Sequence, residues 1–209
     1  FPMIIYDGML KYANFSPDIL QNIENRIGLQ LQDVEYEERK ENGFLAIDLI
    51  DYIYAVLHSV TYRDTYHDFL QNDFPTIPYP ASAEYFFKMA EFGKRLRYLH
   101  ELKGIDRKDL ITTYPVIGEK DNNVVLIHKF EETNEGIGRV WINKEQYFDG
   151  VPLEAWNMII AGYQPLEKWL KDRKDKHLTG NEIIHYQKMV VALVKTIRTQ
   201  EEIDEIIEL

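Results

Sequence analysis

The chain has 209 residues, 45% of them hydrophobic and 13% aromatic, so it is long enough to bury a sizeable core. Its formal net charge is −11 and it contains no cysteine, which excludes disulfides, thiolate catalysis and zinc sites made of cysteine. No apolar run reaches the roughly 18 residues of a membrane span, and the N-terminus lacks the order of a signal peptide. We therefore expect a cytoplasmic protein with no membrane partner.

The first half of the chain carries helical patterns. Ser16 and Pro17 begin a predicted helix that Gly28 ends. A second predicted helix covers residues 47–58, and its expected buried face consists of Ile47, Ile50, Ile53, Tyr54 and Leu57. A shorter helix is expected over residues 62–70. Three prolines within residues 73–80 then predict an extended connector.

The second half mixes helices with a small sheet. A helix is predicted from Ser82 to about Leu102, with an apolar stripe made of Phe86, Met89, Phe92, Leu96 and Leu99. Residues 124–127 and 139–142, on either side of a polar turn at residues 134–136, predict a hairpin or a pair of strands.

Three more helices are expected toward the C-terminus. Pro152 begins a predicted helix that runs to Gly162, and Pro165 begins another that runs through Trp169. Thr179 and Glu182 have capping-box spacing and open a long C-terminal helix, with Ile183, Tyr186, Val190, Leu193 and Ile197 on one face.

These elements predict a helix-rich α+β fold in which several helices pack with a small antiparallel sheet or hairpin. We expect one domain over residues 1–209, with a helical block and proline-rich connector in residues 1–80 and the hairpin and long helix in residues 81–209. The chain opens at Phe1 with strand-like residues 1–6 already under way. We therefore expect it to be a fragment of a longer protein.

No catalytic motif is visible in the sequence. None of the six histidines has metal-ligand spacing, and phosphate loops, dinucleotide-binding glycines and nucleophile elbows are absent. Asp149 with Asp172-Arg173-Lys174 imitates the acidic ligands and lysine of a magnesium nuclease. The helical spacing of residues 166–174 favours a chance similarity. We expect no catalytic residue, no metal and no cofactor in this chain.

Basic residues are concentrated late in the chain. Residues 165–198 contain eight lysines and arginines against four acidic residues. The excess is consistent with one basic face on an acidic body, or with an ordinary solvated helix surface. Five nearby aromatic residues fit either core packing, which the pattern favours, or contacts with bases and sugars beside the amides of Asn143, Gln146 and Gln164. They are Trp141, Tyr147, Phe148, Tyr163 and Trp169.

Three stretches resemble a known family when they are taken together: residues 47–70, residues 73–78 and residues 140–174, the last containing Gly162-Tyr163-Gln164-Pro165. They are similar to the C-terminal specificity domain of Type ISP restriction-modification enzymes and related single-chain adenine-specific DNA methyltransferase and restriction proteins. The helix around residues 184–188 resembles the closing helix of that family.

The resemblance implies recognition of a target sequence in double-stranded DNA. An upstream adenine-N6 methyltransferase domain with S-adenosylmethionine, and nuclease modules, would then carry the catalysis of the parent protein. The methyltransferase signature Asn-Pro-Pro-Tyr is absent from this chain.

The charge pattern and the resemblance together suggest specific DNA contacts. We expect Lys168, Lys171, Arg173, Lys174 and Lys176 to contact phosphates. Gln164 is a candidate for a base edge, and Tyr163 beside it is a further candidate for DNA contact. The alternative is a structural module that docks onto the methyltransferase core with little direct DNA contact. A third reading, cleavage by Asp149 and Asp172, would require magnesium-dependent activity of this chain alone.

Overall fold

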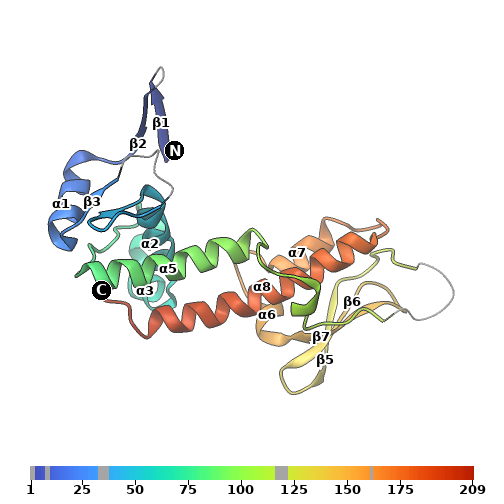
Figure 1. The fold of residues 1–209 in the computed structure, drawn as a ribbon. Helices are drawn as coiled ribbons and strands as arrows, with labels where there is room; N and C mark the ends of the chain where they lie inside the picture. Colours follow the sequence, from blue (N-terminus) through green and yellow to red (C-terminus); the bar gives the residue numbers. More distant parts are fainter. Residues whose placement is uncertain (1–2, 8–9, 33–37, 116–121, 161) are drawn as a thin grey trace. The chain divides into compact units, whose positions relative to one another are not determined.

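The computed structural model describes residues 3–7, 10–32, 38–115, 122–160 and 162–209. It has the predicted α+β character, with helices, small sheets and a long helix near the C-terminus (Figure 1). The chain divides into two compact units. Unit 1 comprises Phe1–Arg97 and Thr199–Leu209, and unit 2 comprises Tyr98–Arg198. The chain passes from unit 1 to unit 2 within helix α5 (Ala83–His100) and returns to unit 1 within helix α8 (Gly180–Asp204).

Unit 1 is mainly helical. Its other elements, in chain order, are β1 (Ile4–Asp7), β2 (Leu10–Ala13), α1 (Pro17–Ile27), β3 (Gln30–Leu31), β4 (Gly43–Phe44), α2 (Ala46–His58), α3 (Val60–Thr65) and α4 (His67–Asn72). β1 and β2 form an antiparallel hairpin, and β3 pairs with β4 in parallel. The extended start predicted for residues 1–6 lies partly outside the described residues, and β1 accounts for its described part.

The predicted helix starts and stops in unit 1 are mostly confirmed. Pro17 occupies the first turn of α1, and Gly28 ends the helix at φ +69°, where a side chain would be strained. Residues 62–70 form two short helices rather than one, because the chain leaves helical geometry at Tyr66. The connector at residues 73–80 is extended, as predicted. The hydroxyls of Tyr62 and Tyr52 donate to the carbonyls of Thr76 and Pro78 and hold it in place.

The predicted buried face of α2 is confirmed only in part, since Ile53, Tyr54 and Leu57 pack against the core. Ile47, Ile50, Ile53, Tyr54 and Leu57 are only half-buried. The fully buried side chains lie on the adjoining face: they are Leu49, Tyr52, Ala55 and Val56, together with Asp48 and Asp51. This helix is apolar on most of its circumference, so periodicity alone could not choose its core face.

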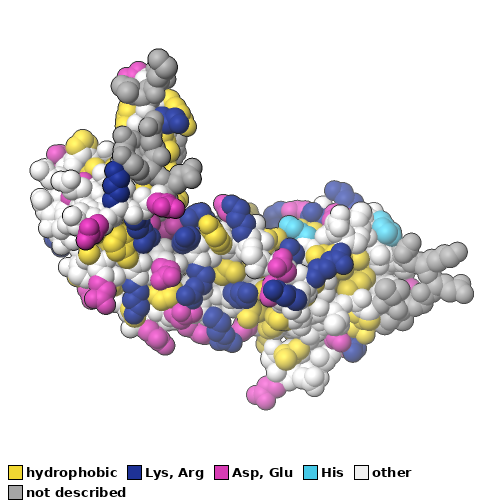
Figure 2. Space-filling view, viewed as in Figure 1, with side chains coloured by type: hydrophobic (Ala, Val, Ile, Leu, Met, Phe, Trp, Pro, Cys, Tyr) yellow, Lys and Arg dark blue, Asp and Glu magenta, His cyan; other side chains and the backbone are white. Residues whose placement is uncertain are grey.

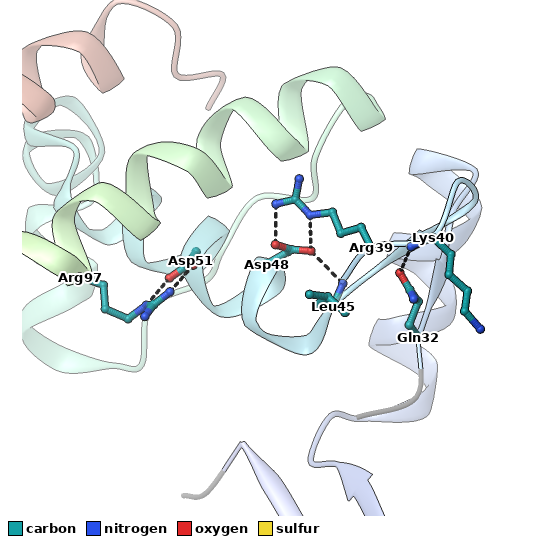
Figure 3. Close-up of polar contacts among 7 residues, drawn as sticks. All are labelled: Gln32, Arg39, Lys40, Leu45, Asp48, Asp51 and Arg97. Carbon is teal, nitrogen blue, oxygen red and sulfur yellow. Dashed lines mark hydrogen bonds and ion pairs between the residues drawn. The ribbon is translucent and has the colours of Figure 1, made fainter. Parts of the chain in front are cut away.

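Arginine partners explain how two carboxylates can be buried on α2. Arg39 binds Asp48 through both Nε and Nη2, at 2.9 and 2.7 Å, and Asp48 also accepts the backbone N–H of Leu45 (Figure 3). Arg97 of α5 binds Asp51 in the same two-pronged way, at 2.8 and 2.9 Å. Such bidentate pairs satisfy both carboxylate oxygens and so make their burial tolerable.

Unit 2 combines a three-stranded sheet with helices. Its elements, besides the shared parts of α5 and α8, are η1 (Arg107–Asp109), β5 (Lys129–Asn134), β6 (Ile137–Trp141), β7 (Tyr147–Pro152), α6 (Leu153–Asn157) and α7 (Pro165–Lys171). The sheet is antiparallel in the order β5-β6-β7. One face of this sheet packs on α7 and α8 in a core that includes Val140, Phe148, Leu166, Leu170 and Tyr186.

Part of the predicted sheet in unit 2 is confirmed. The hairpin turns at residues 134–136 as expected, but its first strand is Lys129–Asn134, so the prediction of a strand at residues 124–127 is wrong. β7 was not predicted. The helix that we expected from Pro152 to Gly162 is wrong beyond Asn157, where α6 ends.

The long C-terminal helix is confirmed. Glu182 and Thr179 form the predicted capping box: the Thr179 backbone N–H donates to the Glu182 carboxylate at 3.0 Å, and the Glu182 N–H donates to the Thr179 hydroxyl at 3.3 Å. α8 ends at Asp204, before the C-terminus. Among the described helices, none combines the length and apolar character that would be needed to cross a membrane.

Candidate nucleic-acid interface

Helix α7 carries two of the predicted DNA-binding residues, Lys168 and Lys171, and the others lie just before or just after it. Pro165 occupies its first turn and Gln164 its N-cap, while Leu166 and Leu170 are fully buried against the core of unit 2. Burial of these two leucines turns Lys168 and Lys171 toward solvent. The sequence therefore places a lysine-bearing face of α7 on the surface by ordinary amphipathic packing.

Acidic neighbours on α7 pair with these two lysines. Lys168 Nζ lies 2.7 Å from the Asp172 carboxylate, and Lys171 Nζ lies 2.8 Å from that of Glu167. The imidazole of His128 is also 3.2 Å from Glu167. Both lysine pairs join residues four apart on an exposed helix, an arrangement worth only about 0.3–0.5 kcal/mol. A phosphate group could therefore compete with either carboxylate.

Arg173 is the most firmly held cation of this group. Its guanidinium carbon lies 3.6 Å from the centre of the Trp169 ring, and its Nε donates to Glu182 at 3.1 Å. Nη1 donates to the Trp169 carbonyl at 3.3 Å. The imidazole of His185 also stacks on Trp169, with the two ring centres 5.8 Å apart. The arginine is thus oriented by contacts from α7 and from the first turn of α8.

The charges around Arg173 affect two titrating neighbours. The hydrogen bond from the Thr179 backbone N–H lowers the pKa of Glu182, and Arg173 lowers it further. Burial lowers the pKa of His185, to which the positive charges of Arg173 and Lys188 add. Near neutral pH the cluster therefore combines an ionised Glu182 with a neutral His185.

Lys174 and Lys176 differ from the other predicted contacts. Both are exposed and follow α7, and in the described part of the chain no carboxylate lies within ion-pair distance of either Nζ. Lys176 Nζ makes one weak hydrogen bond, of 3.4 Å, to the Asp172 carbonyl. Val125 and Lys176 are joined by a backbone hydrogen bond of 3.0 Å, which fixes the position of this segment. These two ammonium groups are available to an anion.

A tight turn precedes α7. Ile160 and Tyr163 exchange two backbone hydrogen bonds, of 2.8 and 3.0 Å, and Gly162 between them has φ +81°. The Tyr163 side chain is 60% exposed and Gln164 is half-exposed. The two isoleucines before the turn, Ile159 and Ile160, are exposed as well. Sequence reasoning missed both, because it extended the preceding helix over them.

The other candidate aromatics pack within the protein. Phe148 is fully buried and Tyr147 nearly so, whereas Trp141 is half-buried and donates its indole N–H to Glu131 at 2.6 Å. Of the five, Tyr163 is the most exposed. Core packing, which the pattern favoured, therefore describes most of the set.

The neighbouring amides are structural. Asn143 is buried, donates to the carbonyls of Asn122 and Val124, and accepts from the N–H groups of Glu145 and Gln146. Gln146 is buried too. Of the three amide side chains that the sequence suggested as base readers, only Gln164 lies at the surface.

The two carboxylates that imitate a nuclease are engaged separately. Asp149 on β7 binds Arg139 at 3.0 Å, and Asp172 binds Lys168. Within the described residues, histidine and carboxylate side chains form no group of three suited to a metal ion.

The net charge is distributed unequally between the two units. Unit 1 contains 20 acidic and 9 basic residues, and so carries the entire excess of −11, whereas unit 2 contains 15 of each. On the face drawn in Figure 2, lysines and arginines are interspersed with acidic side chains. Because DNA affinity depends on cations at phosphates, unit 2 is better suited than unit 1 to lie against a duplex.

Comparison with solved structures shows that the fold occurs in much larger proteins. The chain is similar to part of DrdV in its cryo-EM complex with DNA, at 17% identity and a TM-score of 0.67, over 99% of this chain and 21% of that one. It is also similar to part of a nuclease-deletion mutant of the Type ISP restriction-modification enzyme LlaGI with a DNA substrate mimic. There the identity is 24% and the TM-score 0.52, over 83% of this chain and 14% of the other.

A third similar structure is the ATP-dependent Type ISP restriction-modification enzyme LlaBIII bound to DNA, at 18% identity and a TM-score of 0.58. The match covers 96% of this chain and 12% of LlaBIII. The chain therefore spans about a fifth or less of the length of these three proteins. No curated protein sequence matches it. Over residues 1–209 the sequence matches one family along its entire length, and the chain belongs to the family of Type ISP C-terminal specificity domains.

Proposed function

We propose that this chain is the part of a restriction-modification enzyme that recognises target DNA, and that unit 2 provides its DNA-contacting face through α7 and residues 172–177. The observation that carries the proposal is the pair of exposed cations Lys174 and Lys176, which have no carboxylate partner in the described residues and belong to the unit without net negative charge. Phosphate contacts need such cations.

Each predicted residue has a distinct part in this proposal. Lys174 and Lys176 bind phosphates directly, while Lys168 and Lys171 exchange a carboxylate for a phosphate. A guanidinium has five N–H groups, so Arg173 can keep its bonds to Glu182 and Trp169 and still donate to a phosphate from a fixed position. Gln164 and Tyr163, at the start of α7, approach the base edges.

The parent enzyme supplies the chemistry in this proposal. An upstream domain of the same chain would be an adenine-N6 methyltransferase that binds S-adenosylmethionine, with a nuclease module as a further activity. The three similar enzymes are several times longer than this chain, which leaves room for such domains. A cytoplasmic location belongs to the same proposal, since the substrate is cellular DNA.

Fluorescence anisotropy with a pool of short labelled duplexes at about 50 and 200 mM salt tests the DNA contact. We expect a steep loss of affinity between the two salt concentrations. Replacing both Lys174 and Lys176 by alanine should reduce the slope of log affinity against log salt by about two units, because each lost phosphate contact removes about 0.9. Lys108→Ala, an exposed lysine of η1 in the same unit, is the matched control. An unchanged slope in the double variant would exclude these lysines from the interface.

The distribution of charge also favours a second function, that of a docking module. Unit 1 carries the whole acidic excess and would be repelled by phosphates, so it is suited to bind a basic protein surface of the parent enzyme. If substitutions in unit 1 released this chain from the upstream part while the salt-dependent DNA binding persisted, the two units would have separate functions. Loss of both properties together would argue against this division.

A further inference from the structure

The turn before α7 exposes three large apolar side chains within five residues. Ile159 is 63% exposed, Ile160 37% and Tyr163 60%. We call these three residues the apolar tip. Single exposed apolar residues are common, but three within such a short stretch need an explanation.

The backbone keeps the apolar tip in place. The reciprocal hydrogen bonds between Ile160 and Tyr163 close the turn, and Gly162 supplies the positive φ that it needs. Tyr163 is followed directly by Gln164, the N-cap of α7, whose carbonyl accepts the N–H of Lys168 at 2.9 Å. The tip therefore directly precedes the helix that carries two of the proposed phosphate contacts, and Tyr163 lies five residues before the first of them, Lys168.

The chemistry of a duplex narrows what such a tip could contact. Phosphates and most base-edge atoms are polar, and the apolar group that the major groove offers is the C5-methyl of thymine. Wedging between base steps would also use apolar side chains, but it costs a few kcal/mol of unstacking. Contact with methyl groups has no such cost and leaves Gln164 at the height of the base edges.

We propose that Ile159, Ile160 and Tyr163 form an apolar reader of thymine methyl groups in the major groove. This inference rests on the proposed function, because it assumes that the α7 face lies against a duplex. It assigns the base-specific contribution to the apolar tip and the sequence-independent contribution to the lysines that follow it. The proposed reader contains no charged group, so its contribution does not depend on salt.

Binding to two duplex pools tests the proposal. The first pool contains thymidine, and the second has the same sequences with deoxyuridine, which lacks the C5-methyl. We expect the wild-type chain to bind the second pool more weakly, by about fourfold for each buried methyl. The Ile159→Ser/Ile160→Ser variant should bind both pools equally and keep the wild-type salt slope. Ile111→Ser, at 49% exposure in the same unit, is the matched control and should discriminate between the pools as the wild type does.

The outcomes separate this inference from the proposed function. Salt-sensitive binding with equal affinity for both pools, or a preference for thymidine that persists in the double serine variant, would overturn the apolar reader and leave the DNA-binding face intact. Absence of salt-sensitive binding by the wild type would overturn both.

Photo-crosslinking provides a second readout. When 5-iododeoxyuridine replaces thymidine, the iodine occupies the position of the methyl group. We expect irradiation to crosslink the peptide that contains Tyr163, identified by mass spectrometry, and the Tyr163→Ser variant to lose this product. Crosslinks confined to other peptides would contradict the assignment.

Discussion

The carboxylate of Asp204, the last residue of α8, accepts a 2.5 Å hydrogen bond from the hydroxyl of Ser59, the residue that caps α3. The same carboxylate accepts the backbone N–H groups of Val60 and Thr61, both at 3.2 Å. An acidic residue at the C-terminal end of a helix is opposed by the helix dipole. At the N-terminus of α3 the same charge is favourable, which explains its position.

We therefore expect Asp204→Ala to destabilise unit 1, with a loss of about 1–2 kcal/mol in the free energy of unfolding, typical of a lost N-cap. Urea denaturation followed by circular dichroism would measure it. Glu205→Ala is the control, because it removes a neighbouring exposed charge that has the same unfavourable relation to α8. Equal stability of the two variants would show that Asp204 does not cap α3.

Two arginines of α5 allow a test of buried against exposed ion pairs. Arg97 binds Asp51, whose side chain is 3% exposed, whereas Arg95 binds the exposed Glu202. Arg97→Met should cost about 3–5 kcal/mol of unfolding free energy, because it leaves a buried carboxylate without its partner. Arg95→Met should cost about 0–1 kcal/mol. Chemical denaturation of both variants decides the point, and similar losses would mean that Asp51 is solvated when Arg97 is removed.

The contribution of Arg173 to DNA binding should have two parts, one from its fixed orientation and one from its charge. Arg173→Lys keeps the positive charge but loses the planar contact with Trp169, worth about 0.5–2 kcal/mol. We expect weaker DNA binding with an unchanged salt slope, whereas Arg173→Ala should also lower the slope by about one unit. Anisotropy titrations at several salt concentrations would measure both. If Arg173→Ala kept the wild-type slope, Arg173 would only join α7 to α8.

Acidification should weaken unit 1 through His58. Burial lowers the pKa of this histidine below its ordinary value of about 6.5, and Arg63 lowers it further, although the carbonyl of Tyr54 opposes the shift. At a pH between the folded-state and the unfolded-state pKa of His58, the unfolded chain binds more protons than the folded chain. Stability therefore falls as the pH drops below about 6.5. The loss levels off below the folded pKa, and above pH 6.5 the residue makes no contribution.

Urea unfolding at pH 7.5 and at pH 5.5 checks this prediction. The wild-type chain should lose more unfolding free energy between the two conditions than His58→Gln, which has no titrating ring. If both lost the same amount, other groups would account for the acid sensitivity.

The helix ends that are marked by local capping residues were the most predictable features of the sequence. Pro17 with Gly28, and Thr179 with Glu182, specify local hydrogen bonds and backbone angles that need no distant partner. The strands were less predictable. β5 has the sequence KFEETN with mostly exposed side chains, and β7 contains Gly150 and Pro152, so both owe their conformation to pairing with β6.

In the candidate interface, too, the contacts within one helix were predictable, whereas the contacts with distant segments were not. The lysines of α7 and their partners four residues away could be predicted from helical spacing. The contact of Arg173 with Glu182 joins two helices and could not. The sequence pattern predicted a helix that continues over Ile159 and Ile160, and the end of α6 at Asn157 leaves them exposed instead.

Unit 1 consists of two chain segments that are separated in sequence by the whole of unit 2. Its core includes the fully buried Ile203, near the end of the chain. The segment Thr199–Leu209 emerges from the ribosome only after all of unit 2, so unit 1 cannot complete its folding before unit 2 has been synthesised. Closing such a distant contact is entropically costly and slow compared with forming local helices. A polypeptide that terminates before Thr199 would lack Ile203 and leave the core of unit 1 incomplete, a form that cellular quality control removes.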